Sequence, residues 1–479
     1  MIFSYLENSA KEYPDKIAVE DRKEQISYKK LYDASLSLGS YIDLNIDKNN
    51  KFIGILMDKS IDFIVAIFGI LSNKRAYVPL DESLPTERLE YIVEDAKIDC
   101  IVTDKKHFNL AAKLCEKPIL VDRNNIVISE AFTHVKASQD SIAYILYTSG
   151  STGKPKGIMH TQNSAISFIS WAKQYFGVKF SDVLSSHAPF HFDLSIFDVF
   201  VSISSGAKLC LLPKSISCFP VSLIKYIIDK KITIWYSVPY IIVDMFADRE
   251  ITSTELKNLR TIIYAGESMA IEKAKKIQEK LNKVNLYNLY GPTETNVITY
   301  YKLSSETWER KDKQIPIGYN CPYSKIKIIN DEGNECKVGE VGELCVKTDS
   351  LMLGYLGIDK NILIDGYYYT GDNAHIDENG LIIFNSRKDY MTKVNGFRVE
   401  LGDIENNIRG YEKVRDCYAK IDRSKKRDKI VVVIEAENSL STSSLEKYLR
   451  ECLPNYMIPD EYIICEKLER NSRGKIVRK

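Results

Sequence analysis

The sequence lacks an excess of charge of either sign, a long apolar run and any closely paired cysteines. Its 66 basic and 65 acidic residues leave a formal net charge of +1, so electrostatics gives no reason to expect nucleic acid or a membrane as a partner. No apolar run reaches the roughly 18 residues that indicate a membrane span, and the N-terminus lacks the apolar core of a signal peptide. The ten cysteines include no C-x-x-C pair, which predicts neither a zinc site nor a disulfide framework and favours a reducing cytoplasm.

The sequence does have length and an alternation of helical and strand patterns. Its 479 residues exceed one ordinary hydrophobic core and predict two or more domains. Residues 27–42 and 62–74 have helical spacing, and residues 76–81 predict a short strand and turn. Three later segments each place an apolar run before a polar or glycine-containing turn: residues 231–239, 259–267 and 284–295. This arrangement puts functional loops at the carboxyl ends of strands in an α/β fold.

The pattern changes twice towards the C-terminus. Residues 318–369 predict short strands with many glycines, whereas residues 428–437 predict a strand and residues 443–454 a helix that starts from a serine cap. We therefore expect an α/β protein whose large domain, residues 1–388, combines subdomains of mostly parallel sheet with a strand-rich subdomain. Residues 389–479 are expected to form a small α+β domain.

One glycine-rich stretch, "YILYTSGSTGKPKG" at residues 144–157, has the chemistry of a phosphate contact but is not a P-loop. A Walker loop needs glycine where Thr148 stands, and a hydroxyl after Lys154 where the chain has Pro155. Proline also disfavours a helix at the preceding lysine. The apolar run before the loop predicts a buried strand, which argues against a flexible linker. Backbone N–H groups, hydroxyls and lysines suit a transient polyphosphate contact; an ordinary tight turn is the alternative.

Five blocks follow one another along the chain: "YTSGSTGKPKG", "NLYGPTET", "YYTGD", "SRKDYMTKVNGFRVE" and "NSRGK". Together they resemble the motifs of the adenylate-forming superfamily, which includes acyl-CoA synthetases, luciferases and the adenylation domains of nonribosomal peptide synthetases. The resemblance extends from residue 76 to Lys475. It implies that residues 144–157 are the family's mobile phosphate loop, which contacts the β- and γ-phosphates of ATP.

The resemblance implies ATP and Mg²⁺ at the site. Adenylation joins a carboxylate to the α-phosphate and expels pyrophosphate, so donors and positive charge are needed where charge develops. Thr293 offers a hydroxyl to the α-phosphate and Glu294 an oxygen ligand to Mg²⁺. Tyr290 offers a face to adenine, while Asp372 accepts from the ribose hydroxyls and Arg387 is a second ribose contact. The nucleotide positions are Thr148, Ser149, Gly150, Ser151, Thr152, Gly153, Lys154, Gly266, Glu267, Asn288, Tyr290, Gly291, Asp372 and Arg387.

Three further positions are implied for the small domain. Lys475 resembles the catalytic lysine, whose ammonium can touch the substrate carboxylate and the ester oxygen together; a solvated tail lysine is the alternative. Asp389 matches the hinge about which the small domain turns after adenylation. Residues 393–400, "KVNGFRVE", then resemble the loop that replaces Lys475 at the site for thioester formation.

The substrate class depends on the segment "HAPFHFDLSIFDVF". Amino-acid-activating members have an aspartate where Asp193 stands, and it pairs with the substrate's α-amino group. Acyl and aryl activators generally lack this carboxylate, which is costly in an apolar pocket unless it is paired. The alternative is that Asp193 is a helix N-cap, since the following residues continue helically; both roles can coexist.

The family's pocket positions correspond to Asp193, Leu194, Phe197, Tyr236, Ile263, Ala265, Leu289, Val297 and Ile298. They describe an apolar, aromatic-walled pocket with one carboxylate, which implies a small or medium apolar amino acid. The series resembles that of enzymes that load L-proline onto a carrier protein, and a proline ring could lie against Phe197 and Tyr236. D-alanine ligases share the "FDLS" block, but they typically have cysteine at the position of Ala265.

No carrier or condensation domain is recognised in the sequence, so we expect the acceptor thiol to be the phosphopantetheine arm of a separate carrier protein, with coenzyme A as the alternative. The expected activity is AMP-forming ligation of an amino acid to that carrier. An acyl- or aryl-CoA ligase and a non-catalytic adenylate-binding protein are the competing hypotheses. Asp193 argues against the first, and the joint presence of Lys475, Glu294 and Asp372 argues against the second.

Overall fold

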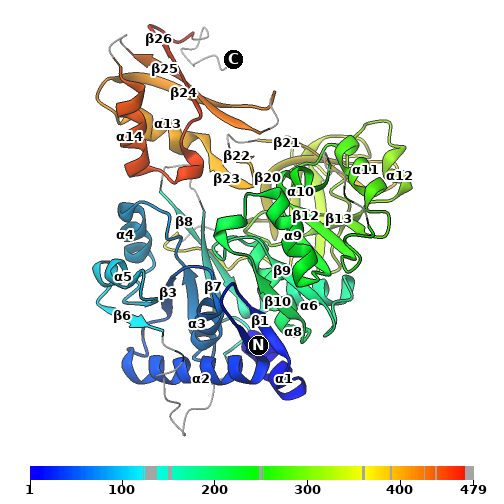
Figure 1. Ribbon diagram of the computed structural model, residues 1–479. Coiled ribbons are helices and arrows are strands. Elements are labelled where there is room, and N and C mark those ends of the chain that lie inside the picture. Colours follow the sequence, from blue (N-terminus) through cyan, green and yellow to red (C-terminus); the bar gives the residue numbers. More distant parts are fainter. Residues whose placement is uncertain are drawn as a thin grey trace. The chain divides into compact units, whose positions relative to one another are not determined.

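The computed structural model divides the chain into two compact units, which are described separately (Figure 1). It describes residues 1–121, 123, 137–148, 154–247, 251, 253–358, 362–388, 391–424, 427–436 and 440–469. Unit 1 consists of residues 1–82, 95–146 and 158–386, and unit 2 of residues 83–94, 147–157 and 387–479. Unit 2 thus includes two segments that the sequence analysis placed in the large domain. The predicted boundary between residues 388 and 389 stays a prediction.

The largest sheet of unit 1 has nine strands in the order β15-β14-β13-β12-β11-β9-β10-β1-β2. They are β1 (Ile17–Glu20), β2 (Gln25–Ser27), β9 (Val183–Ser186), β10 (Lys208–Leu211), β11 (Ile234–Ser237), β12 (Thr261–Ala265), β13 (Asn285–Tyr290), β14 (Thr299–Lys302) and β15 (Tyr319–Asn320). β11, β12 and β13 are parallel, and β14 runs antiparallel to β13. The three predicted strand-and-turn segments therefore end at the same edge of one sheet.

A second sheet has the order β18-β8-β7-β4-β3-β5-β6. Its strands are β3 (Phe52–Leu56), β4 (Ala76–Pro79), β5 (Cys100–Thr103), β6 (Lys117–Leu120), β7 (Ile142–Thr148), β8 (Lys156–Thr161) and β18 (Gly354–Tyr355). The predicted strand at residues 76–81 is confirmed as β4, and the buried strand expected before the glycine-rich stretch is β7.

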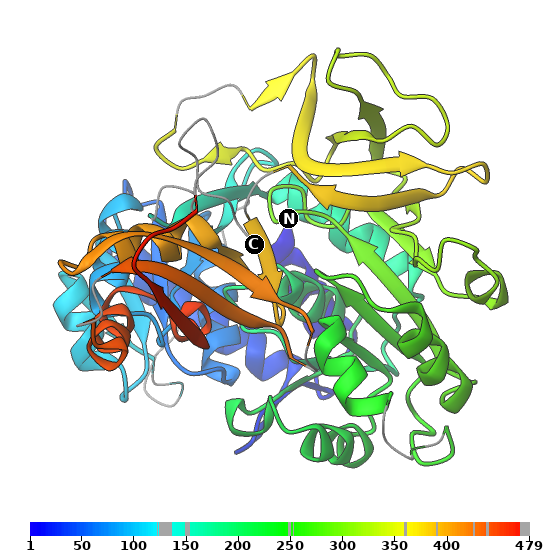
Figure 2. The same ribbon diagram turned by 90° about the horizontal axis from the view of Figure 1, so that it is seen from above.

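The strand-rich region forms a separate sheet in unit 1, drawn in yellow-green and yellow in Figure 2. It contains β16 (Ser324–Ile329), β17 (Gly342–Thr348), β19 (Leu363–Ile364), β20 (Tyr367–Ile376) and β21 (Ile382–Arg387). β17 pairs antiparallel with both β16 and β20. This sheet places Asp372 on its longest strand, β20.

The helices of unit 1 bury the faces of these sheets. They are α1 (Ile2–Glu12), α2 (Tyr28–Asn45), α3 (Ile61–Leu71), α5 (Phe108–Leu114), α6 (Gln162–Tyr175), α7 (Leu194–Ile196), the π-helix η1 (Phe197–Val201), α8 (Ser202–Ser204), η2 (Lys214–Ile216), α9 (Pro220–Lys230), α10 (Pro239–Phe246), α11 (Ile271–Lys280) and α12 (Ser305–Trp308). The two helices expected near the N-terminus are confirmed as α2 and α3, whose Ser27 and Ser60 side chains accept the capping hydrogen bonds.

One continuous apolar cluster joins residues of the nine-stranded and seven-stranded sheets with helices α1, α2, α3 and α6. A second cluster covers the other face of the nine-stranded sheet, where Trp235 and Tyr264 pack with residues of α9, α10 and α11. Alternation along β11 and β12 explains the division, because successive side chains of a strand point to opposite faces. Tyr236 and Ile263 therefore belong to the first cluster and their neighbours to the second.

Unit 2 has its own apolar core of residues from its sheets and helices. A hairpin of β22 (Met391–Val394) and β23 (Phe397–Glu400) and a sheet of β24 (Val414–Asp422), β25 (Lys429–Ala436) and β26 (Glu461–Cys465) accompany α13 (Leu401–Arg409), α14 (Thr442–Cys452) and η3 (Asn455–Met457). The hairpin turns at Asn395 and Gly396, both with positive φ, as a two-residue Asn-Gly turn requires. The strand and helix expected at residues 428–437 and 443–454 are confirmed as β25 and α14. The serine that caps the helix is Ser441.

Most of residues 83–94 of unit 2 lie in α4 (Thr86–Asp95). Arg88 from this helix donates two hydrogen bonds to Asp403 of α13, at 2.9 and 3.0 Å, and a third at 2.7 Å to the carbonyl of Cys452. Across the described part of the chain, no helix combines the length and apolarity that crossing a membrane demands. All ten cysteines are free.

Candidate active site

The predicted amino acid positions come together on one face of the nine-stranded sheet. Register aligns Tyr236 with Ile263 and Ala265 with Leu289 across β11, β12 and β13. All four side chains are buried and belong to one apolar cluster, together with Phe197 and Val297. Phe197 meets Tyr236 edge to face, with ring centroids 5.3 Å apart and planes at 78°. The sheet thus provides a floor and η1 an aromatic wall.

Asp193 lies at the start of the short helix that leads into η1. It occupies the N-cap position of α7, but its side chain makes no capping hydrogen bond. Instead, Oδ2 accepts a hydrogen bond from the hydroxyl of Thr293 at 2.8 Å. The capping alternative therefore does not explain this carboxylate in the structure. The contact joins two predicted site residues that are 100 positions apart in the sequence.

The turn after β13 is fixed by two unusual backbone positions. A Cβ atom at Gly291 would lie 1.7 Å from the carbonyl oxygen of Asn296, so the close approach excludes any other residue. Asn296 itself has a φ of 52°. The turn brings Thr293 and Glu294 to the carboxyl end of β13, where the sequence predicted a functional loop.

His160 supports this turn from β8. Its Nε2 lies 2.8 Å from the carbonyl oxygen of Thr293 and its Nδ1 3.2 Å from the hydroxyl of Ser164. Since a carbonyl can only accept, Nε2 carries the proton. The imidazole is completely buried, and burial lowers its pKa to about 4. A neutral histidine therefore fixes the backbone of the Thr293 turn.

Glu294 is 1% exposed. Its Oε1 accepts from the hydroxyl of Tyr355 at 2.9 Å, and its carbonyl oxygen accepts from the N–H of Met352 at 2.7 Å. Among the residues that the structure describes, no group of three or more histidines, cysteines or carboxylates could hold a metal ion. A single positioned carboxylate nevertheless fits Mg²⁺, which proteins commonly bind through one or two carboxylates plus substrate phosphates and water.

Tyr290 and Asp372 face each other from two different sheets. The phenol of Tyr290, at the end of β13, donates to Oδ2 of Asp372 on β20 at 2.5 Å. Asp372 is 3% exposed, and its N–H donates to the hydroxyl of Thr370 at 3.1 Å. The predicted adenine and ribose contacts are therefore neighbours.

Three other predicted nucleotide positions have clear local environments in unit 1. Gly266 follows β12 with a φ of 100°, and Glu267 is part-buried in the bend after it. Asn288 is buried, and its Nδ2 donates to the carbonyl oxygen of Pro316 at 2.8 Å. Asn288 thus holds the adjoining backbone in place.

In unit 2, Thr148 ends β7 and Lys154 is exposed, with Nζ 5.2 Å from the centre of the Tyr91 ring. Arg387, at the end of β21, also belongs to unit 2. Ser149, Gly150, Ser151, Thr152, Gly153, Asp389 and Lys475 lie outside the described residues. The roles expected for all of these residues stay predictions.

Two pocket positions differ from the others. Leu194 is only part-buried beside the first apolar cluster, and Ile298 belongs to another cluster, with Ile158, Ile317 and Leu344. Val297 and Ile298 are neighbours leading into β14, and their side chains enter different cores. The structure therefore does not group Ile298 with the other pocket positions.

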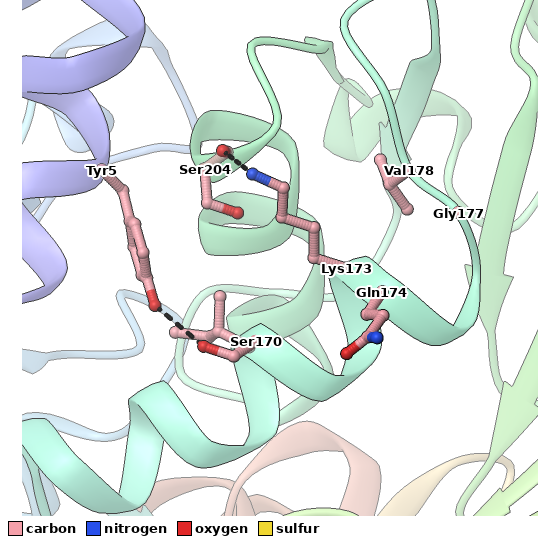
Figure 3. A pocket seen from close by; sticks show the side chains of 8 residues that line it. Tyr5, Ser170, Lys173, Gln174, Gly177, Val178 and Ser204 are labelled. Atoms are coloured by element: carbon pink, nitrogen blue, oxygen red, sulfur yellow. Dashed lines mark hydrogen bonds between the residues drawn. The ribbon is translucent and has the colours of Figure 1, made fainter.

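A surface hollow of about 450 Å³ lies elsewhere in unit 1 (Figure 3). Residues of α1, α6 and α8 and of the chain after α6 line it. Tyr5 points to Ser170, with their hydroxyl oxygens 3.3 Å apart, and Lys173 donates to the carbonyl oxygen of Ser204 at 2.6 Å. No predicted site residue is among the residues that line this hollow.

The family model described as "AMP-binding enzyme" matches residues 6–356. The chain belongs to the AMP-binding enzymes. It is thereby a member of the adenylate-forming superfamily, as its five sequence blocks indicated.

Curated AMP-binding relatives match along almost the whole chain. A D-alanine–D-alanyl carrier protein ligase of Bacillus cytotoxicus is 31% identical, covering 100% of this chain and 98% of its own. An L-proline–[L-prolyl-carrier protein] ligase of Pseudomonas fluorescens is 30% identical, covering 98% and 96%. A zwittermicin A synthase of Bacillus cereus is 31% identical, covering 97% and 91%.

Solved structures share the fold at lower identity. The Vibrio cholerae adenylation domain AlmE, in complex with glycyl-adenosine-5'-phosphate, superimposes with a TM-score of 0.88 at 23% identity, covering 99% of this chain and 96% of its own. An o-succinylbenzoate CoA synthetase of Bacillus subtilis gives a TM-score of 0.87 at 20% identity, covering 99% and 97%. The fold class expected from the sequence, α/β with a large and a small part, is confirmed.

Sequence reasoning missed residues that hold the candidate site together. His160, Tyr355 and Asn296 each contact or shape the turn that contains Thr293 and Glu294. Of these three, only His160 is close in the sequence to a predicted motif, because it lies on β8, the strand that follows the glycine-rich stretch. Tyr355 lies 61 positions from its partner, and no pattern along the chain connects the two.

Proposed function

We propose that the protein activates an amino acid as its aminoacyl adenylate, with ATP consumed and pyrophosphate released, and then transfers the aminoacyl group to the phosphopantetheine thiol of a carrier protein. The observation that supports this most is the placement of Asp193. Its carboxylate makes no helix cap and stands beside an apolar, aromatic wall, with its one described hydrogen bond coming from Thr293. Asp193 is part-buried, so a substrate that covers it removes its remaining contact with water; that is costly without a cationic partner, and an α-ammonium group provides one.

In the first half-reaction, an oxygen of the amino acid carboxylate attacks the α-phosphorus of ATP and the bond to the leaving pyrophosphate breaks. Asp193 orients the amino acid through its ammonium group. Thr293 now donates its single O–H to Asp193; once the substrate ammonium pairs with Asp193, the hydroxyl can rotate and donate to the α-phosphate instead. Glu294 would hold Mg²⁺, which offsets phosphate charge when bound.

The nucleotide is positioned by the pair of Tyr290 and Asp372. The bond between them fixes the ring that is expected to lie against adenine and the carboxylate that is expected to accept from ribose. Thr148 to Lys154 and Arg387 complete the proposed nucleotide contacts, and Lys475 is the proposed donor to the reacting carboxylate. A preorganised donor of this kind is worth roughly 10²–10³ in rate.

The proposed substrate is a small or medium apolar amino acid, with L-proline first. The wall of Phe197 and Tyr236 suits a compact ring, and the L-proline ligase of Pseudomonas fluorescens matches over nearly the whole chain. D-alanine is the second candidate, because a D-alanyl carrier protein ligase matches with slightly higher identity and coverage than the L-proline ligase. Ala265 leaves more room at the floor than the cysteine expected in those ligases, which favours the larger substrate.

The deciding experiment is amino-acid-dependent exchange of labelled pyrophosphate into ATP, with the twenty amino acids, D-alanine and an aryl acid. We expect L-proline to give the strongest exchange. A dominant D-alanine signal would correct the substrate but keep the reaction class. Exchange with the aryl acid alone would contradict amino acid activation.

The two half-reactions separate the proposed roles in unit 2. Lys475→Ala should slow adenylate formation but still transfer from preformed aminoacyl adenylate. Gly396→Leu should do the opposite, because Gly396 has a φ of 90° in the turn between β22 and β23, where a side chain strains the backbone. Single-turnover rates of each step measure both effects. Equal slowing of both steps by Lys475→Ala would contradict the division of labour.

A further inference from the structure

Lys59 lies between β3 and α3 and points its ammonium group at the chain segment that leads to Asp193. Nζ donates to the carbonyl oxygens of Ser186 at 2.9 Å, His187 at 3.1 Å and Ala188 at 2.6 Å. It also lies 5.1 Å from the centre of the Phe190 ring. Three successive carbonyls take the three donors of one ammonium group. Lys59 therefore fixes the backbone of residues 186–188, where the segment that carries Asp193 and Phe197 (residues 186–201, called the substrate segment) begins.

Asp198 lies at the other end of the same segment, on the π-helix η1. It is 1% exposed, and no residue that the structure describes forms a hydrogen bond with either carboxylate oxygen. Burial raises its pKa well above the usual range, and the positive charge of Lys59 opposes that shift. Lys59 in turn has its pKa lowered to about 8 by burial, and the charge of Asp198 opposes this. The charged form of each group thus opposes the pKa shift that burial causes in the other.

The residues proposed to meet the amino acid lie between these two anchors. Asp193 and Phe197 follow the carbonyls of residues 186–188 and precede or adjoin Asp198 in the chain. A π-helix inserts one extra residue into a helical turn and is often found at functional sites, so its register needs an external reference. The ammonium group of Lys59 provides that reference where the segment begins, at the carbonyl oxygens of residues 186–188.

We propose that Lys59 is a positioning residue for the amino acid site: by binding the carbonyl oxygens of residues 186–188, it sets where Asp193 and Phe197 stand. It does not touch the substrate. The inference rests on the amino acid activation proposed above. A merely stabilising role is the competing explanation, because the loss of hydrogen bonds to buried carbonyls also lowers the stability of the fold.

The protein contains a matched control. Lys16 also directs its ammonium group at backbone carbonyls, those of Phe180 and Gly206, and burial lowers its pKa to about 8 as well. None of its described partners is a site residue. Lys59→Met and Lys16→Met therefore remove the same chemistry from two places, of which only one adjoins the substrate segment.

The test compares KM for the amino acid and for ATP in pyrophosphate exchange, with the amino acid that the wild type uses. For Lys59→Met we expect KM for the amino acid to rise, on the order of 10²-fold, because a displacement of about 1 Å in the residues that orient a substrate can have an effect of that size. KM for ATP should be unchanged. Lys16→Met should change neither KM, although its melting temperature falls. An unchanged amino acid KM in Lys59→Met, or an equal rise in Lys16→Met, would overturn the proposal.

Two additions keep the proposal testable if Lys59→Met fails to fold or if the wild type activates no amino acid. Lys59→Arg keeps a cationic donor for the same carbonyls, and it should raise the amino acid KM in the same direction but less. Hydrogen exchange of peptides covering residues 186–201 needs no substrate. Faster exchange there in a Lys59 variant than in Lys16→Met supports the proposal, and equal exchange overturns it. A wild type without exchange activity would refute the proposed function alone.

Discussion

The candidate site in unit 1 has two proposed halves, one for the nucleotide and one for the amino acid, and different kinds of contact hold them together. In the nucleotide half, polar side chains hold one another: Tyr290 donates to Asp372, Tyr355 to Glu294, and His160 supports the Thr293 carbonyl. In the amino acid half, Phe197, Tyr236 and the floor of β12 and β13 are packed apolar residues, and Asp193 is the one predicted charge among them. A hydrogen-bonded half fixes geometry whatever the substrate, whereas a packed half sets the size of what fits.

Removing the charge from the packed half should have the largest effect. We expect Asp193→Ala to weaken amino acid binding by roughly 3–5 kcal/mol, because the substrate ammonium then lacks its partner in an apolar pocket. ATP binding and the melting temperature should change little, since Asp193 makes no capping hydrogen bond. Calorimetric titration with each substrate measures the split. Asp193→Asn is the control that keeps an acceptor for Thr293 without the charge. Unchanged amino acid affinity in both variants would show that Asp193 pairs with no ammonium.

Acid should weaken the nucleotide half through His160. Its pKa is about 4 in the folded protein, against the ordinary value of 6.5 for an exposed histidine, so between these values the unfolded chain binds a proton that the folded chain does not. Stability is therefore complete above pH 6.5 and falls as the pH decreases towards 4, by up to about 3 kcal/mol at 1.36 kcal/mol per pKa unit.

Urea unfolding at several pH values, compared with His160→Gln, isolates this contribution from the titrating carboxylates. The variant should show a shallower fall in the free energy of unfolding over the same range. Parallel curves for the two proteins would mean that His160 is charged in the folded state.

Short-range features were predictable from the sequence, and contacts between distant segments were not. The helices at residues 27–42 and 62–74 and the strand-and-turn segments follow from periodicity and caps, which act over a few residues. The bonds of Asp193 with Thr293 and of Glu294 with Tyr355 join segments 100 and 61 positions apart. No local pattern encodes such a pairing, because it results from how whole sheets pack.

Carrying positions over from a family also has a physical limit. Val297 and Ile298 were both expected in the pocket, and they enter different apolar clusters. Adjacent side chains in an extended segment point to opposite sides, so the structure separates the two side chains, and their expected pocket roles stay predictions. The π-helix at Phe197 was expected as an ordinary helix, since one inserted residue leaves no periodic signal over so short a segment.

A smaller effect is expected from cutting one bond of the nucleotide half. Tyr290→Phe keeps the ring but removes the hydrogen bond to the buried Asp372, and hydrogen bonds to charged groups contribute roughly 1.5–3 kcal/mol. KM for ATP should rise accordingly, by about 10- to 100-fold, while KM for the amino acid stays constant. Tyr319→Phe, at an exposed tyrosine, is the control. A rise in the amino acid KM would mean that the two halves are not separable.

The smallest effect is expected from the aromatic wall itself. Edge-to-face pairs contribute about 0.5–1.5 kcal/mol beyond the area that they bury, and Phe197 and Tyr236 have this geometry, at 5.3 Å and 78°. A double-mutant cycle of Phe197→Leu and Tyr236→Leu in urea unfolding should give a coupling energy in that range.

Because the wall also sets the width of the proposed pocket, Phe197→Leu should shift pyrophosphate exchange towards larger apolar amino acids and leave KM for ATP unchanged. Tyr5→Leu, at a partly buried tyrosine on the remote α1, is the matched control for losing an aromatic ring. If the exchange profile of Phe197→Leu follows that of Tyr5→Leu, the packed half does not select the substrate by size.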